Sequence, residues 1–222
     1  KYFHDDLGLS KPNQESRVML NQAYFSSTTN FNNIYAYCVP RLENKTSTNI
    51  QSNFLTVGQK TSIKNSLEND KIMSSEVVFV DPVYVAVDIY PVDPVITIDL
   101  NKISDTRLTI VKKGIAQQSN DSLKQQVYNA IISYFTFTSS TLGQTVDITQ
   151  LVNNILSIDD ISNIYTSFKG GDKKPGLSLL VWNPVYTSDI IAINQNLKLP
   201  AFKFPYLYDE SGLLSKIEII SE

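Results

Sequence analysis

The chain has 222 residues, 42% of them hydrophobic, and a formal net charge of -3, so it can form a folded core as one large domain or two small ones. No basic cluster exceeds a pair such as Lys112-Lys113, and because phosphate binding needs a basic face, we expect no nucleic-acid partner. No apolar run approaches the roughly 18 residues of a membrane-spanning helix, so we expect no membrane partner. The start on Lys1 rather than methionine suggests part of a longer chain.

The cysteine and histidine content limits the available chemistry. Cys38 is the only cysteine and His4 the only histidine, which excludes an internal disulfide, a cysteine-based zinc site and a multi-histidine metal site. A nucleophilic triad or dyad would have to recruit His4. We therefore expect no bound metal and no cofactor. Cys38 lies within IYAYCVP and is interpreted as a small buried hydrophobic residue in a strand.

The first part of the chain predicts helices and strands in mixed order. Loose helical spacing predicts a helix over Lys11 to Phe25, and the aromatic and β-branched run IYAYCV predicts a strand over Ile34 to Val39. The polar segment from Arg41 to Asn53 is typical of a loop. Apolar residues four apart then predict a short one-sided helix over Thr61 to Lys71.

The stretch EVVFVDPVYVAVDIYPV, from Glu76 to Val92, gives the strongest strand pattern, and Pro82 interrupts it. Because proline lacks the N–H that a sheet needs, we expect two strand segments joined by a kink, not one flat central strand. The run before Pro82 is apolar on both faces. The run after it alternates, so we expect one buried face and one partly solvent-exposed face. The expected buried face carries Val83, Val85, Val87 and Ile89, and the expected exposed face carries Tyr84, Ala86, Asp88 and Tyr90.

The middle of the chain predicts two packed amphipathic helices. Helical spacing predicts the first over Asn120 to Phe137, where Ser122 with Gln125 resembles a capping box. It predicts the second from Val146 to Leu156, with Asp147 or Thr145 as its cap. Strands are predicted at Val95 to Leu100 and Ile161 to Phe168, and Leu108 to Val111 fits either a strand or a helix.

The last fifty residues are divided by prolines into short, extended pieces. LSLLVW predicts a strand, Lys198 to Tyr208 is expected to be extended, and Lys216 to Ile220 predicts a final strand. Without regular alternation of strands and helices, the order predicts an α+β fold with mixed or antiparallel sheets and a β-rich C-terminal region. We predict an α+β region over residues 1–168 and a β-rich, proline-punctuated region over 169–222, either separate or packed with the first as one unit.

Four aromatic residues alternate near the end of the chain: Phe202, Phe204, Tyr206 and Tyr208. Alternate residues of an extended segment share one side. They either cover the core of this chain or form a partner surface, where aromatic residues are enriched. These four residues are the candidate interface.

Acidic residues offer a weak case for catalysis. Asp81, Asp88, Asp93 and Asp99 are candidates for a carboxylate-dependent glycosidase, which needs two acids facing one cleft. Here they lie beside prolines, where aspartate is an ordinary turn residue, or on the expected exposed face. The segment GGDKKPG lacks phosphate-loop spacing and is interpreted as a turn, and Asp159-Asp160 as a solvated turn. We assign no catalytic residue and expect no enzyme activity.

Three segments carry a resemblance to a known family: LSKPNQESRVMLNQAYF, NFNNIYAYCVPR and EVVFVDPVYVAVDI. They resemble the baseplate wedge proteins of T4-type contractile-tailed phages, more narrowly the C-terminal part of gene six products, within the baseplate-J-like group. The later order of two helices and a strand fits the same group. The resemblance covers most of Ser10 to Phe168 and is weak beyond Lys169.

The resemblance implies a structural protein of the virion, in the tail baseplate, assembled in the host cytoplasm. It implies a homodimer and contacts with other wedge proteins, forming a ring around the central hub. It carries over no active-site residue and implies no small-molecule substrate. We hypothesise that Pro82 and Pro91 restrict where strands pair, so that neighbouring edges and aromatic segments can join subunits. The alternatives are a glycan- or receptor-binding module of a phage tail and, third, the glycosidase.

Overall fold

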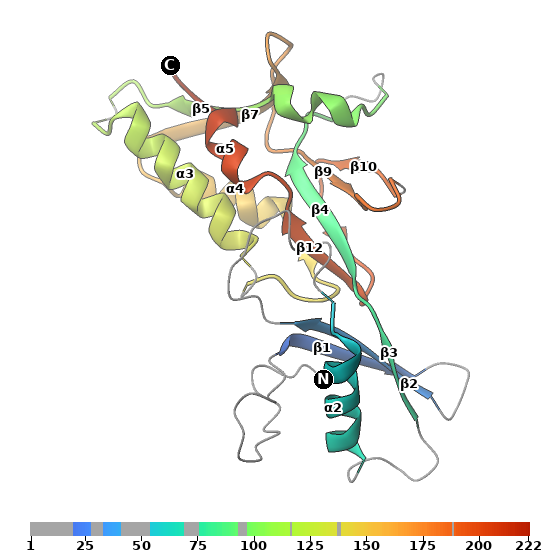
Figure 1. Ribbon diagram of the computed structural model, residues 1–222. Helices are drawn as coiled ribbons and strands as arrows, with labels where there is room; N and C mark the ends of the chain where they lie inside the picture. The colour runs from blue at the N-terminus through green and yellow to red at the C-terminus, as the bar shows by residue number, and fades with distance from the viewer. Residues whose placement is uncertain are drawn as a thin grey trace.

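The computed structural model describes residues 20–27, 33–40, 54–68, 76–92, 97–115, 117–136, 139–187 and 189–222. Their helices and strands form mixed and antiparallel sheets, so the predicted α+β class is confirmed. In Figure 1 a small sheet with one helix lies at one end, and the larger body with the remaining helices lies at the other.

The small sheet contains β1 (Leu20–Ser27), β2 (Asn33–Pro40) and β3 (Glu76–Val80), in the order β1-β2-β3. β1 is antiparallel to β2, and β3 is parallel to it. Helix α2 (Val57–Leu67) begins with a capping box in which the Thr56 hydroxyl accepts from the Gln59 N–H. Among the described residues, the buried hydrophobic core of this unit contains Ala36, Cys38, Leu55, Ile63 and Val77.

The central sheet has the order β10-β9-β4-β12. Its strands are β4 (Val83–Ile89), β9 (Leu179–Trp182), β10 (Ile191–Ile193) and β12 (Lys203–Leu207). β12 is parallel to β4, and β9 is antiparallel to it. Asp81 and Pro82 separate β3 from β4, so the chain leaves the small sheet and enters the central sheet there. The predicted kink is confirmed.

A third sheet, the helix-covered sheet, has the order β13-β5-β7-β8. Its strands are β13 (Ile217–Ser221), β5 (Thr106–Lys112), β7 (Ile161–Phe168) and β8 (Lys174–Pro175). The 3-10 helix η2 (Leu100–Asp105) leads into β5, and β6 (Thr145–Val146) pairs with β11 (Leu197–Lys198). The helices are α3 (Asn120–Tyr134), α4 (Ile148–Leu156) and α5 (Glu210–Lys216), and Figure 1 places them together on one side of this sheet.

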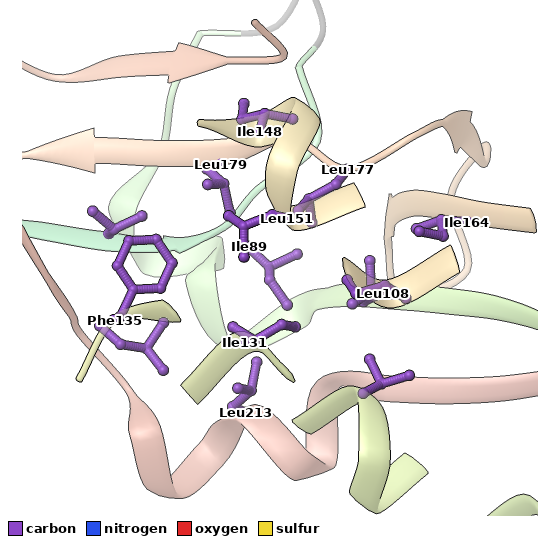
Figure 2. Packing of buried hydrophobic residues seen from close by; sticks show 14 of the residues in the cluster. Ile89, Leu108, Ile131, Phe135, Ile148, Leu151, Ile164, Leu177, Leu179 and Leu213 are labelled. Atoms are coloured by element: carbon purple, nitrogen blue, oxygen red, sulfur yellow. The ribbon is translucent and has the colours of Figure 1, made fainter. Parts of the chain in front are cut away.

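The main core lies between these helices, the helix-covered sheet and the central sheet. Figure 2 shows Ile89, Leu108 and Ile131 converging with Leu179 and Leu213. The residues come from both predicted regions, 1–168 and 169–222. Strands also pair across that boundary, β4 with β9 and β12, and β5 with β13. The C-terminal residues are therefore packed with the earlier ones in shared sheets.

Three sequence predictions of local structure need correction. Residues 20–27 of the predicted helix from Lys11 to Phe25 form strand β1, and residues 11–19 lie outside the described part. Within the predicted strand from Val95 to Leu100, residues 97–99 are irregular and Leu100 begins η2. Both errors reflect pairing and connections that a local pattern does not contain. The capping box on α3 is also wrong, because the cap is Ser119, whose hydroxyl accepts from the Ser122 N–H.

Other elements agree with the predictions. The strand over Ile34 to Val39 and the strand over Ile161 to Phe168 are present as β2 and β7. Leu108 to Val111, left open between strand and helix, belongs to β5. The Asp147 side chain accepts from the Gln150 N–H at 2.9 Å and caps α4, as one of the two predicted alternatives requires. The loop predicted from Arg41 to Asn53 lies outside the described residues.

Candidate functional site

The candidate aromatic interface divides into buried and exposed residues. Phe204 is 0% and Tyr206 1% exposed, whereas Phe202 is 37% and Tyr208 39% exposed. The two buried rings lie in a core cluster on the second face of β4. Phe204 and Tyr206 therefore belong to the core of the chain and offer no surface to a partner. Only the two ends of the alternating segment reach solvent, because only there does the chain leave the sheet.

Phe202 lies where the small sheet meets the central sheet. Its ring centroid is 5.9 Å from that of Tyr37, a half-buried residue of β2. Its carbonyl accepts from the Val83 N–H at 3.0 Å, at the start of β4. The two rings thus form a partly exposed aromatic pair across the join between two sheets.

Tyr208 lies at the opposite end of β12. Its ring centroid is 4.9 Å from that of Trp182, and its N–H donates to the Val87 carbonyl at 2.9 Å. Trp182 is 3% exposed and is therefore buried beneath this contact. The turn that follows β9 exposes Val185 (60%) and Tyr186 (74%), and these apolar side chains provide a second partly apolar surface.

A buried ion pair connects β4 to the end of α5. Lys216 Nζ lies 2.7 Å from the Asp88 Oδ2 atom, and these side chains are 2% and 1% exposed. The Ile89 N–H donates to the other carboxylate oxygen of Asp88 at 2.7 Å, and Asp209 Oδ2 lies 3.7 Å from Lys216 Nζ. Burial raises the pKa of Asp88 to about 6, although the Lys216 charge and hydrogen bond act in the opposite direction.

This pair corrects the prediction for β4. Asp88 and its neighbours Tyr84, Ala86 and Tyr90 were expected on a partly exposed face, but all four are buried. The second face is covered because Val39 of β2, Ile103 of η2 and Leu142 pack with it in a second core cluster. The sequence predicted Lys216 only as the first residue of a strand, and its ion pair with Asp88 was not predicted. An aspartate within a strand of apolar residues was the available signal for a buried cationic partner.

The other described acids make contacts that organise the fold. Asp81 Oδ1 accepts from Lys60 Nζ at 2.9 Å, and Asp99 caps η2 by accepting from the Asn101 N–H. Asp160, expected to be solvated, instead accepts from two backbone N–H groups of the connection after β5 and has a φ of 74°. Asp93 lies outside the described residues. The structure therefore does not bring the described members of the acidic set together around one cleft.

Cys38 is buried at 3% exposure, which confirms the sequence interpretation. Burial raises the pKa of its thiol to about 12, so the thiolate is strongly disfavoured. In the segment GGDKKPG, Gly170 has a φ of 73° and lies two residues after the end of β7, and Lys174 and Pro175 form the short strand β8. The segment is thus the predicted turn.

Concave regions on the described surface include a polar hollow and a groove. An open hollow of about 400 Å³ lies between the end of α3 and the start of α4. All of its lining side chains carry a hydroxyl or an amide: Ser133, Tyr134, Ser139, Thr141, Gln144, Thr145, Gln150 and Asn154. A groove of about 320 Å³ lies beside β9 and β10, where the Lys203–Asp189 ion pair of 3.1 Å is part of its wall.

Comparison with protein-family models and with curated proteins finds no match to this chain. Among the described residues, no helix is both long and apolar enough to span a membrane. The described residues also contain no group of three or more His, Cys, Asp or Glu side chains arranged to hold a metal ion.

Proposed function

We propose that the chain is a structural subunit of a phage tail baseplate wedge. It associates with a second copy of itself and with other wedge proteins to form the ring around the hub, within the virion, after assembly in the host cytoplasm. In this proposal, the chain functions through its contact surfaces and needs neither catalysis nor a cofactor. Three sequence segments that resemble baseplate wedge proteins support this proposal.

One structural observation carries the proposal further. The aromatic pair of Phe202 and Tyr37 is partly exposed, and it lies where the small sheet meets the central sheet. Aromatic residues at a surface add large apolar contact area with little loss of side-chain freedom, which is typical of protein interfaces. A contact made at this join would also hold the small sheet against the body.

The experiment mixes the chain with the neighbouring wedge proteins and measures complex mass by light scattering after size exclusion. We expect a complex of defined mass. The Phe202→Ser variant should weaken it about tenfold or more, because truncating a well-packed interface aromatic residue costs about 2 kcal/mol. Leu156→Ser is the matched control, because Leu156 is 39% exposed on α4 at a different place. Equal complex formation by both variants would show that Phe202 is not part of the interface. Absence of any complex would contradict the proposed role as a wedge subunit.

A glycan- or receptor-binding module of a phage tail is the second candidate, and the open hollow favours it. Hydroxyl and amide side chains both donate and accept hydrogen bonds, and the hydroxyl groups of a sugar do the same. Gln150 and Asn154 are exposed residues of α4 that line the hollow. Binding of a panel of neutral glycans that is lost in the Gln150→Ala/Asn154→Ala double variant would support this candidate over the first.

A further inference from the structure

The outer edge of β12 is blocked by local chemistry. Phe202 and Tyr208 direct their backbone groups toward β4, as their hydrogen bonds to Val83 and Val87 require. In a parallel pair these directions alternate, so Lys203, Pro205 and Leu207 direct theirs outward. Pro205 has no N–H, and the Lys203 carbonyl accepts from the Gly143 N–H at 2.8 Å. Proline and a covering loop are the usual ways in which a strand edge is protected.

Among the described residues, neither a proline nor a hydrogen-bonded loop protects the outer edge of β13. The Glu222 N–H donates to the Lys112 carbonyl at 3.1 Å, so Glu218, Ile220 and Glu222 face β5. Ile219 and Ser221 therefore direct their N–H groups outward, and Ile217 and Ile219 direct their carbonyl groups outward. Within the described residues, β13 is the last strand of its sheet, and its pairing with β5 is free of bulges. An edge of this kind recruits another strand.

The sequence of β13 is compatible with itself in an antiparallel arrangement. A twofold axis through Ile219 brings Ile219 opposite its equivalent and Ser221 opposite Ile217 of a second copy, so all the outward backbone groups find partners. On the outer face, Glu218 then lies opposite Ile220 of the second copy, so no like charges oppose one another directly. Glu218 is already paired with Arg107 at 3.2 Å.

The apolar side of the strand supports the same arrangement. The side chain of Ile219 is half-buried against the main core, and Ile217 is 1% exposed. Helix α3 packs beneath β13. A second copy would cover the remaining surface of Ile219 and bring the two α3 helices alongside each other, which adds contact area beyond the strands themselves.

We propose that two copies of this chain pair through the outer edges of β13, in an antiparallel register centred on Ile219. The helix-covered sheet then continues from one copy into the other. This inference rests on the self-association proposed above, and it specifies which strand forms the contact between the two copies.

The test compares Ile219→Pro with Ile219→Ala. Both variants lose the isoleucine packing, but only proline loses the outward N–H, and neither loses a backbone bond to β5 because residue 219 makes none there. Sedimentation velocity over a concentration series gives the dimer dissociation constant of each. We expect proline to weaken the dimer roughly tenfold to hundredfold relative to alanine, from two lost hydrogen bonds across the axis. Circular dichroism verifies that both variants are folded.

A cross-linking experiment gives an independent reading. Ile219→Cys places a thiol next to its equivalent, and a short bismaleimide should give a covalent dimer, whereas Ser157→Cys, exposed at the end of α4, should not. The buried Cys38 is common to both variants. Equal dissociation constants for the proline and alanine variants, with a parent that does dimerise, would overturn the β13 register and leave self-association standing. A parent that stays monomeric would overturn both.

Discussion

β3 and β4 are consecutive, valine-rich strands with opposite surroundings. In β3 only Val77 is buried, whereas six of the seven residues of β4 are buried. β3 lies at the edge of the small sheet, and among the described strands only β2 pairs with it. β4 lies between β9 and β12, with one core cluster on each face.

The difference shows that pairing partners decide how much of a strand is buried. Two runs of similar composition, separated by Asp81 and Pro82, become an edge strand and a central strand because, among the described strands, β9 and β12 pair with β4 and only β2 pairs with β3. We infer that stability is concentrated in the body around β4.

The largest effect should follow from removing one partner of the buried ion pair beside β4. Lys216→Met leaves the Asp88 carboxylate buried without its cation, and we expect a loss of about 3–5 kcal/mol in the free energy of unfolding. Chemical denaturation measures it. The Asp88→Leu/Lys216→Met double variant should recover most of the loss, because it removes both charges. A single variant that unfolds like the parent would mean that the pair is solvated.

Truncation in the two strands tests the comparison directly. Ile89→Ala in β4 should cost about 2–5 kcal/mol, because Ile89 is 0% exposed in the main core. Val80→Ala in β3 should cost less than about 1 kcal/mol, because Val80 is half-buried. Both changes are measured by urea denaturation. Equal losses would show that the small sheet is as tightly packed as the body.

The pH dependence of stability should report the buried state of Asp88. Its pKa is about 6 in the folded chain and 3.8 in an ordinary environment, so the folded state binds this proton more tightly. The corresponding stabilisation, about 3 kcal/mol, is fully present below pH 3.8 and is lost as the pH rises through 6. Unfolding free energies of the parent and Asp88→Asn should therefore diverge between about pH 4 and pH 7. A constant difference would contradict the raised pKa.

Small, localised effects should come from the two helix caps. Thr56→Ala on α2 and Asp147→Ala on α4 each remove a side-chain acceptor, at a cost of about 1 kcal/mol. Amide hydrogen exchange should show faster exchange confined to the small unit for the first variant and to α4 and its neighbours for the second. Faster exchange throughout the chain in the Thr56 variant would mean that the two units unfold together.

Local patterns predicted the elements whose stability is local. Helices α3 and α4 follow from apolar residues at helical spacing, and the cap of α4 follows from Asp147. The kink at Pro82 follows from the missing N–H of proline. Each of these depends on residues that are neighbours in the chain.

Local sequence patterns could not predict contacts between residues that are far apart in the chain. Asp88 and Lys216 are 128 positions apart, and neither side chain alone indicates which partner it meets. Phe204 and Tyr206 have the same alternating pattern as Phe202 and Tyr208, and only the parallel pairing of β12 with β4 decides which rings are buried. The sequence therefore identifies the four alternating aromatic residues but not which two of them are exposed.

Sedimentation velocity of the unmodified chain over a wide concentration range tests the central claim most directly. We expect a concentration-dependent shift from the 25.0 kDa chain to a species of twice that mass. A single species of 25.0 kDa at every concentration, unchanged by added wedge proteins, would contradict it.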